Sequence, residues 1–141
     1  MDSLNNPERI QALLEEINAQ NDYARRAGVR MTSISSEQAE GILDITPDAY
    51  NPLGIAHGGF LYMFADTVAG VAAWALTGRS YVTLDSSIHF LRPATEGRLR
   101  AVAKPIQLGR KICIYSVEVF DRNEKKVLYA TLTFFQKDRT S

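Results

Sequence analysis

The sequence predicts an α+β fold in which one long central helix lies against a curved antiparallel sheet of about five to six strands. Three observations support this prediction. A nearly continuous apolar run with helical character occupies residues 60–76. Two strand-like runs precede it, and about four follow after the pattern becomes alternating at Thr77-Gly78. An amphipathic stretch near the start of the chain adds a separate helix.

Length and composition bound the class of protein. The 141 residues predict a single domain with its own core, which we divide into a helical extension over residues 1–28 and a main domain over residues 29–137. The formal net charge is zero, so bulk charge gives no sign of a nucleic-acid or membrane partner. Cys113 is the only cysteine, which excludes an intrachain disulfide. The polar first residues favour a cytoplasmic protein.

The N-terminal part predicts one helix and a strand pair. We expect the helix over residues 7–27, because Asn6 can cap it and Gly28 can end it, although the apolar pattern weakens after residue 18. Strands are expected at residues 29–34 and 41–46, with a turn between them and an irregular loop after them.

The part that follows the central helix predicts a meander. We expect its strands at residues 81–90, 98–107, 112–120 and 127–135. Pro105 indicates a sheet edge or a bulge in the second of these strands. Strict alternation in the first strand would place Val82, Leu84, Ile88 and Phe90 on one face and Thr83, Asp85, Ser87 and His89 on the other.

Asp66 is the only charged residue in the apolar helical run. A helix that is apolar all round is normally buried, and burying an unpaired carboxylate is costly. Asp66 is therefore expected either to be buried with a group that compensates its charge or to line a pocket, and carboxylates in clefts are often functional. The alternative is that Asp66 caps a second helix that begins at Thr67, but neither Gly nor Pro marks a break there.

The glycine pair before this helix predicts a binding site for an oxyanion or a phosphate. The N–H groups at a helix N-terminus lack intrahelical acceptors, and Gly58 and Gly59 allow another molecule to approach them. Asp66 lies eight residues beyond Gly58, about 12 Å along the helix. One helix cannot easily bring both groups together, whereas two antiparallel helices across a two-fold axis can. The spacing therefore predicts a homodimer with shared sites.

Other polar sets have weaker support. Asp85, Ser87 and His89 share a strand face in a serine-triad composition, but their spacing prevents convergence on one point. His57 and His89 are the only histidines, and no zinc motif accompanies them, so no metal is expected. The basic residues at predicted strand ends suit a phosphate-bearing ligand or are simply solvated; these residues are Arg92, Arg110 and Lys111.

These residues amount to a family resemblance. Asn51-Pro-Leu-Gly, then His57-Gly-Gly, then Ala65-Asp-Thr resembles the hotdog-fold acyl-CoA thioesterases, in particular the phenylacetate-pathway (PaaI-type) branch and the related 4-hydroxybenzoyl-CoA thioesterases. The strand from Tyr81 to Ala94 and the Gly109-Arg110 turn are similar to the same family, and the resemblance covers roughly residues 28–136.

The resemblance implies roles for individual residues. Asp66 matches the catalytic carboxylate, acting as a base for water or as the nucleophile, and Gly58 matches the backbone donor to the thioester carbonyl. Asn51 matches an amide that holds the attacking water, and His57 matches the motif histidine near the thioester. A further Ser or Thr is expected nearby, with Thr83 as the first candidate and Thr67 as the second.

The implied function is hydrolysis of acyl-CoA thioesters with an aryl or medium-chain acyl group. Coenzyme A would enter as part of the substrate, with no separate cofactor. We expect Arg92, Arg110 or Lys111 to bind its phosphates, Gly59 to lie close to the substrate, and Tyr62, Met63 or Trp74 to contact the acyl group. The resemblance also implies a dimer, often paired into a tetramer. A hydratase or dehydratase and a non-catalytic acyl-CoA sensor are the alternatives.

Overall fold

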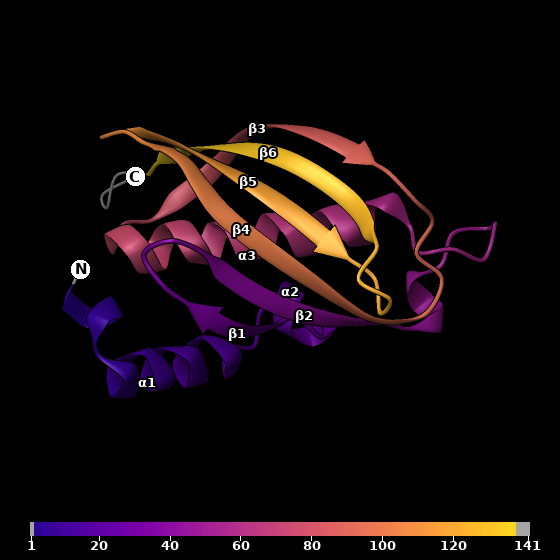
Figure 1. The fold of residues 1–141 in the computed structure, drawn as a ribbon, viewed down its shortest axis with the longest axis horizontal. Helices are drawn as coiled ribbons and strands as arrows, with labels where there is room; N and C mark the ends of the chain where they lie inside the picture. The colour runs from indigo at the N-terminus through magenta and orange to yellow at the C-terminus, as the bar shows by residue number, and fades with distance from the viewer. Residues whose placement is uncertain (1, 138–141) are drawn as a thin grey trace.

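The computed structural model describes residues 2–137 and confirms the α+β prediction (Figure 1). An antiparallel six-stranded sheet wraps around one long helix, α3 (Gly58–Thr77), with the strand order β1-β2-β4-β5-β6-β3. The strands are β1 (Arg30–Ile34), β2 (Ala39–Ile45), β3 (Tyr81–Phe90), β4 (Gly97–Leu108), β5 (Ile112–Phe120) and β6 (Lys126–Gln136). Among the described strands β3 pairs only with β6, so it forms a sheet edge.

The central helix runs without a break, which excludes a second helix beginning after Asp66. His57 caps its start, because the Nδ1 atom of His57 accepts a hydrogen bond of 2.8 Å from the Gly59 N–H. Gly78 ends it in the left-handed conformation, with a φ of 72°. By length and composition alone the helix could cross a membrane. It lies instead against all six strands, and that position accounts for its apolar composition.

One face of α3 is not covered by the sheet. Half-buried residues recur there at helical spacing, and they are Met63, Asp66, Thr67, Gly70, Val71 and Trp74. The apolar run predicted a helix buried on every side, and this prediction is wrong for one stripe. The sheet is too narrow to enclose the helix completely, and an apolar stripe remains available for a ligand or a second molecule.

A β-bulge in β3 contradicts the predicted strand faces. The pairing with β6 shifts between Thr83 and Asp85, so Leu84 has no partner. The extra residue interrupts the alternation of side chains. Thr83 and Ser86 consequently both contact α3 although they are three residues apart, whereas Leu84 is 61% exposed. Val82 is also exposed, and Ile88 packs against the core.

The N-terminal region also differs from the prediction. The single helix expected over residues 7–27 is two helices, α1 (Pro7–Asn18) and α2 (Tyr23–Ala27). Asp22 starts the second helix, because its side chain accepts a 3.0 Å hydrogen bond from the Arg25 N–H. The break turns the chain back towards α3, which α2 contacts.

The remaining elements are close to expectation. Short 3₁₀ turns occupy Asp2–Asn5 and Pro47–Ala49. β2 begins two residues earlier than expected, because the Ser35 N–H and the Gln38 carbonyl close a tight turn before it at 2.8 Å. The register of β4 shifts just after Pro105, so the proline marks a bulge in an interior strand. Cys113 is fully buried, as expected.

Candidate active site

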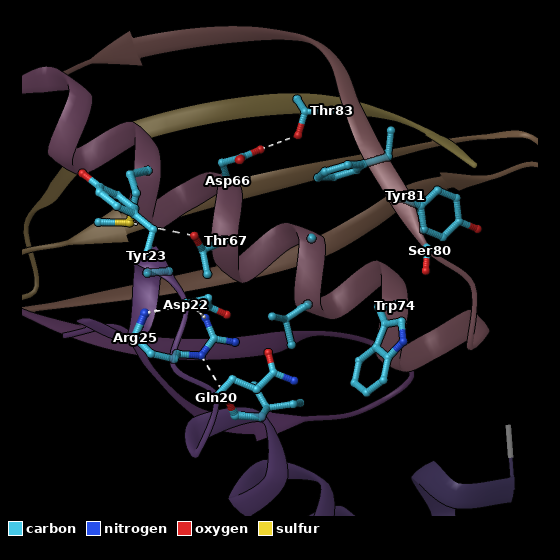
Figure 2. Close-up of a pocket in the computed structure, with 16 residues that line it drawn as sticks. Gln20, Asp22, Tyr23, Arg25, Asp66, Thr67, Trp74, Ser80, Tyr81 and Thr83 are labelled. Carbon is cyan, nitrogen blue, oxygen red and sulfur yellow. Dashed lines mark hydrogen bonds and ion pairs between the residues drawn. The ribbon is translucent and has the colours of Figure 1, made fainter. Parts of the chain in front are cut away.

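Asp66 projects from the uncovered stripe of α3 towards β3 (Figure 2). Its side chain is half-buried, and its Oδ1 atom accepts a hydrogen bond of 2.6 Å from the Thr83 hydroxyl. The bulge beside Leu84 permits this contact together with a contact between Ser86 and α3. The carboxylate is thus oriented by the neighbouring strand, and its Oδ2 atom has no hydrogen-bond partner among residues 2–137.

The first turn of α3 leaves one backbone donor open. The ring of His57 accepts a hydrogen bond of 2.8 Å from the Gly59 N–H, and the carbonyl oxygen of His57 accepts one of 3.0 Å from the Phe60 N–H. The Gly58 N–H has no protein acceptor within the described part of the chain. A helix N-terminus carries a partial positive charge, so this donor can stabilise an oxyanion.

A side chain at either glycine would come too close to a neighbouring residue. A Cβ atom on Gly59 would lie 3.1 Å from Nδ1 of His57, the atom that caps the helix. A Cβ atom on Gly58 would lie 3.1 Å from the ring of Phe90. The Gly59 N–H is occupied, so Gly58 is the better-placed donor of the pair.

Asn51 lies in the loop that leads into α3. Its Oδ1 atom accepts hydrogen bonds from the Leu53 and Ile55 N–H groups, at 2.9 and 3.4 Å, and so closes the loop. The side-chain amide remains as a donor, and Asn51 lines the same cavity as Gly58. What Asn51 can offer a ligand in this arrangement is an N–H group.

Asp66 and Gly58 open into different cavities. Asp66 and Thr83 line a cavity of about 650 Å³ over the uncovered stripe of α3. Gly58 and Asn51 line a second one of about 410 Å³, at the end of the helix. A single chain therefore presents a carboxylate site and a separate backbone-donor site.

Comparisons with known proteins identify the family. The family model described as the thioesterase superfamily matches residues 53–128, more than half of the chain. The chain belongs to the thioesterase superfamily. The 1,4-dihydroxy-2-naphthoyl-CoA hydrolase of Escherichia coli is 28% identical over 107 residues, which cover 74% of this chain and 79% of that protein.

Solved thioesterase structures have the same fold. A thioesterase from Haemophilus influenzae matches with a TM-score of 0.84 at 25% identity and covers 91% of this chain and 92% of its own. The PaaI protein from the phenylacetic acid degradation operon of Escherichia coli matches with a TM-score of 0.83 at 25% identity, over 90% and 93%. The predicted hotdog fold is confirmed, as is membership of a thioester-hydrolase family.

The other residues expected at the thioesterase site are divided between several places. Thr67 lines the Asp66 cavity and lies 3.9 Å from the sulfur of Met63. The hydroxyl of Tyr62 lies 2.7 Å from that of Ser86, outside that cavity. Trp74 lines the far end of the Asp66 cavity. The catalytic and binding roles of all these residues stay predictions.

The three basic residues do not form one cluster within a chain. Arg92 lines the Gly58 cavity. Arg110 and Lys111 lie in the turn between β4 and β5, where the Arg110 carbonyl accepts from Arg79 and the Lys111 carbonyl accepts from Gln136. That turn adjoins the C-terminal end of α3, so these two side chains and Arg92 lie at opposite ends of the helix.

Two further expectations concern the outer face and metals. Asp85, Ser87 and His89 are exposed on β3, and no hydrogen bond joins them to one another among the described residues. No set of three His, Cys, Asp or Glu side chains within residues 2–137 is arranged to hold a metal. The absence of a metal or separate cofactor stays a prediction.

The residues that sequence reasoning missed belong to the N-terminal extension. Gln20, Asp22, Tyr23 and Arg25 line the wall of the Asp66 cavity opposite β3 (Figure 2). The prediction of one helix over residues 7–27 assigned them no role at the site. The signal that was available is Asp22, a favoured N-cap residue within the weakened part of the pattern.

Proposed function

We propose that the protein hydrolyses acyl-CoA thioesters at two sites shared across a homodimer. The observation that carries this proposal is the separation of Asp66 and Gly58 into two cavities of one chain. They lie eight residues apart, about 12 Å along one helix, which is too far for both to act on one carbonyl group. A second copy supplies the missing half of each site.

The uncovered elements of one chain suit such a dimer. β3 is a free sheet edge that can pair with the same strand of a second copy, and the stripe of α3 beside it is half-buried and largely apolar. Tyr62 lies midway between Gly58 and Asp66 and contacts Ser86 near the middle of β3. A two-fold axis near this pair brings Asp66 of each copy towards the partner's Gly58.

The proposed chemistry follows from the free atoms. The partner's Gly58 N–H donates to the thioester oxygen, whose negative charge grows as the carbonyl is attacked. Asp66, held by Thr83, either removes a proton from the attacking water or attacks the carbonyl carbon itself. In the second case the C–S bond breaks, the coenzyme A thiolate leaves, and water then hydrolyses the resulting anhydride. The Asn51 amide group donates to the water or to the carbonyl oxygen. The product pair is a free acid and coenzyme A.

The coenzyme A part of the substrate needs cationic contacts for its phosphates. Arg92 is the first candidate, because it lines the cavity that contains the proposed oxyanion donor. Arg110 and Lys111 lie at the other end of α3. In an antiparallel dimer they would approach a substrate from the opposite copy. A tetramer remains a prediction from the resemblance, and a cytoplasmic location remains a prediction from the polar first residues.

The test is thiol release from a panel of aryl-acetyl, benzoyl and medium-chain acyl-CoA substrates. We expect Asp66→Asn to fold normally and to lose about 10²-fold or more in kcat, because it removes the base or nucleophile while conserving shape. The control is Asp44→Asn, since Asp44 is exposed on β2 and paired only with Arg98. Full activity in Asp66→Asn would exclude both roles for the carboxylate.

Two other outcomes would redirect the proposal. Tight binding of an acyl-CoA without thiol release would indicate a sensor. Addition of water to an enoyl-CoA would indicate a hydratase, although the capping bond occupies one of the two ring nitrogens of His57.

A further inference from the structure

The Asp66 cavity has a polar wall that the proposed reaction does not use. The cavity follows the stripe of α3 from Met63 to Trp74, eleven residues or about 16 Å of helix. The start of β3 borders it on one side and the segment from Gln20 to Arg25 on the other (Figure 2). In that view Asp66 and Thr83 lie above α3, whereas the side chains of Gln20, Asp22 and Arg25 lie below it.

Arg25 is the unusual member of this wall. Its side chain is only 7% exposed, although it is a cation. Its Nε atom donates a hydrogen bond of 3.1 Å to the carbonyl oxygen of Ile17, near the C-terminal end of α1. Basic side chains commonly occupy that position, so this one bond has a structural explanation.

The rest of the guanidinium lacks such an explanation. A guanidinium carries five N–H donors, four of them on the two terminal nitrogens. Within residues 2–137 the terminal nitrogens have one partner, the Asp22 carboxylate, at 3.8 Å from Nη1, which is too long for a hydrogen bond. Four donors therefore face the cavity without an acceptor in the chain, and they remain accessible to water or to a ligand.

The wall is held in place by the adjoining backbone. The Asn18 side chain makes two hydrogen bonds with the Met31 backbone of β1, at 2.8 and 2.9 Å. The Val29 N–H donates to the Ala24 carbonyl oxygen at 2.9 Å, immediately after Gly28 ends α2. Arg25 is thus presented from a fixed position, which lowers the entropic cost of binding.

Between the catalytic carboxylate and this wall the lining is mostly apolar. Val71, Trp74 and Phe134 from the core side and Ile17 from α1 contribute to it. An acyl group whose thioester lies at Asp66 would extend over these residues, and its far end would reach the wall. Asp22 is 47% exposed and offsets the charge of Arg25, so the wall suits a neutral oxygen better than a second carboxylate.

Building on the proposed thioesterase function, we propose that Arg25, with Asp22 beside it, determines specificity by binding a neutral oxygen at the far end of the acyl group. The preferred acyl groups carry a hydroxyl or carbonyl there. A carbonyl oxygen accepts from the guanidinium, and a hydroxyl can accept from Arg25 and donate to Asp22. A substrate without that oxygen displaces water from these donors without replacing its hydrogen bonds and is discriminated against.

The experiment compares acyl-CoA esters of equal length that differ only at the far end, namely octanoyl, 8-hydroxyoctanoyl and octanedioyl. We expect kcat/KM of the wild-type enzyme for the hydroxylated ester to exceed both others by about tenfold or more. Arg25→Met, which keeps an unbranched apolar stem but removes the guanidinium donors, reduces this ratio to about one. The control is Arg26→Met, because Arg26 is exposed and donates to the Asn21 carbonyl oxygen outside the cavity.

Several results would overturn the inference while the thioesterase function stands. They are equal rates of the wild-type enzyme for the octanoyl and hydroxyoctanoyl esters, a preference for the octanedioyl ester, and an equal loss for all esters in Arg25→Met. The first two need no variant, so they apply even if Arg25→Met does not fold. If no ester is hydrolysed, the proposed function fails. The dissociation constants of the same esters, measured by calorimetry, then test the Arg25 contact alone. Equal dissociation constants or undetectable binding would reject that contact.

Discussion

The Tyr115 hydroxyl is the one buried side-chain polar atom in the described part of the chain that lacks a hydrogen-bond partner. The residue is 1% exposed on β5, with its ring packed edge-on against Phe134 at a centroid distance of 6.1 Å. The ring thus contributes to the core beneath the Asp66 cavity, which Phe134 also lines. The hydroxyl adds a desolvation penalty that no described contact offsets.

We expect Tyr115→Phe to increase the free energy of unfolding by about 1 kcal/mol, because it removes an unsatisfied hydroxyl and keeps the ring. Urea denaturation of both proteins at neutral pH measures the difference. A loss of stability instead would indicate that the hydroxyl has a partner in solution, such as an ordered water. The matched control is Tyr129→Phe, since Tyr129 is 36% exposed on β6.

The same hydroxyl predicts an alkaline effect. Burial, followed by the proximity of Cys113 and Tyr81, raises the pKa of Tyr115 above its ordinary value. In the unfolded chain tyrosine ionises at about pH 10, so above that pH the unfolded state loses a proton that the folded state keeps. Stability is therefore full below pH 10 and falls above it. Tyr115→Phe should lose less stability than the wild type between pH 9 and 11, as measured by urea denaturation; parallel losses would refute this.

Among the elements, α3 begins at a single capping side chain. His57 caps the helix and occupies the Gly59 N–H, so Gly58 is left as the open donor. The motif histidine therefore has a structural role whether or not it contacts substrate. Asn and Ser can cap a helix in the same way, whereas Ala cannot.

This role predicts a difference between two substitutions. We expect His57→Ala to lose about 1 kcal/mol of stability and His57→Asn to lose much less. Thiol release should follow the same order, because the cap orients the first turn of α3. Thermal unfolding and steady-state kinetics of the pair are the measurements. Equal losses in both variants would show that the imidazole itself is required.

Sequence periodicity predicts regular elements and misses local insertions. The start and end of α3 follow from His57-Gly58 and Gly78, and the strand runs follow from their alternation. The bulge at Leu84 could not be recognised, because an extra residue in a strand leaves an alternating pattern on either side of it. The break between α1 and α2 was visible as weakened periodicity, but no Gly or Pro marks it.

On the scale of the whole molecule, the two cavities predict complementation between variants. A dimer of one Asp66→Asn chain and one Asn51→Ala chain contains one doubly altered site and one intact site. Random mixing of the two inactive proteins, after denaturation and refolding together, should therefore restore about one quarter of the wild-type activity. Activity that stays at the level of the separate variants would show that Asp66 and Asn51 act within one chain.

The proposed shared site was predictable from the sequence in part. Helix geometry alone separates Asp66 from Gly58, and the structure adds that they open into distinct cavities. Arg25 was not predictable as a lining residue, because its burial depends on α2 folding back onto α3. Contacts between distant segments leave no periodic signal in either segment.

The bulge in β3 has a consequence for reading the family by alignment. Thr83 faces α3 and Leu84 faces solvent, but after the extra residue Ser86 faces α3 again. In a relative whose strand lacks that residue, the side chains on one side of this point alternate between the two faces of the sheet in the opposite order. An ungapped alignment would then match Thr83 with a side chain on the outer face of the sheet, and the strand residue that contacts the equivalent of Asp66 would be found one column away.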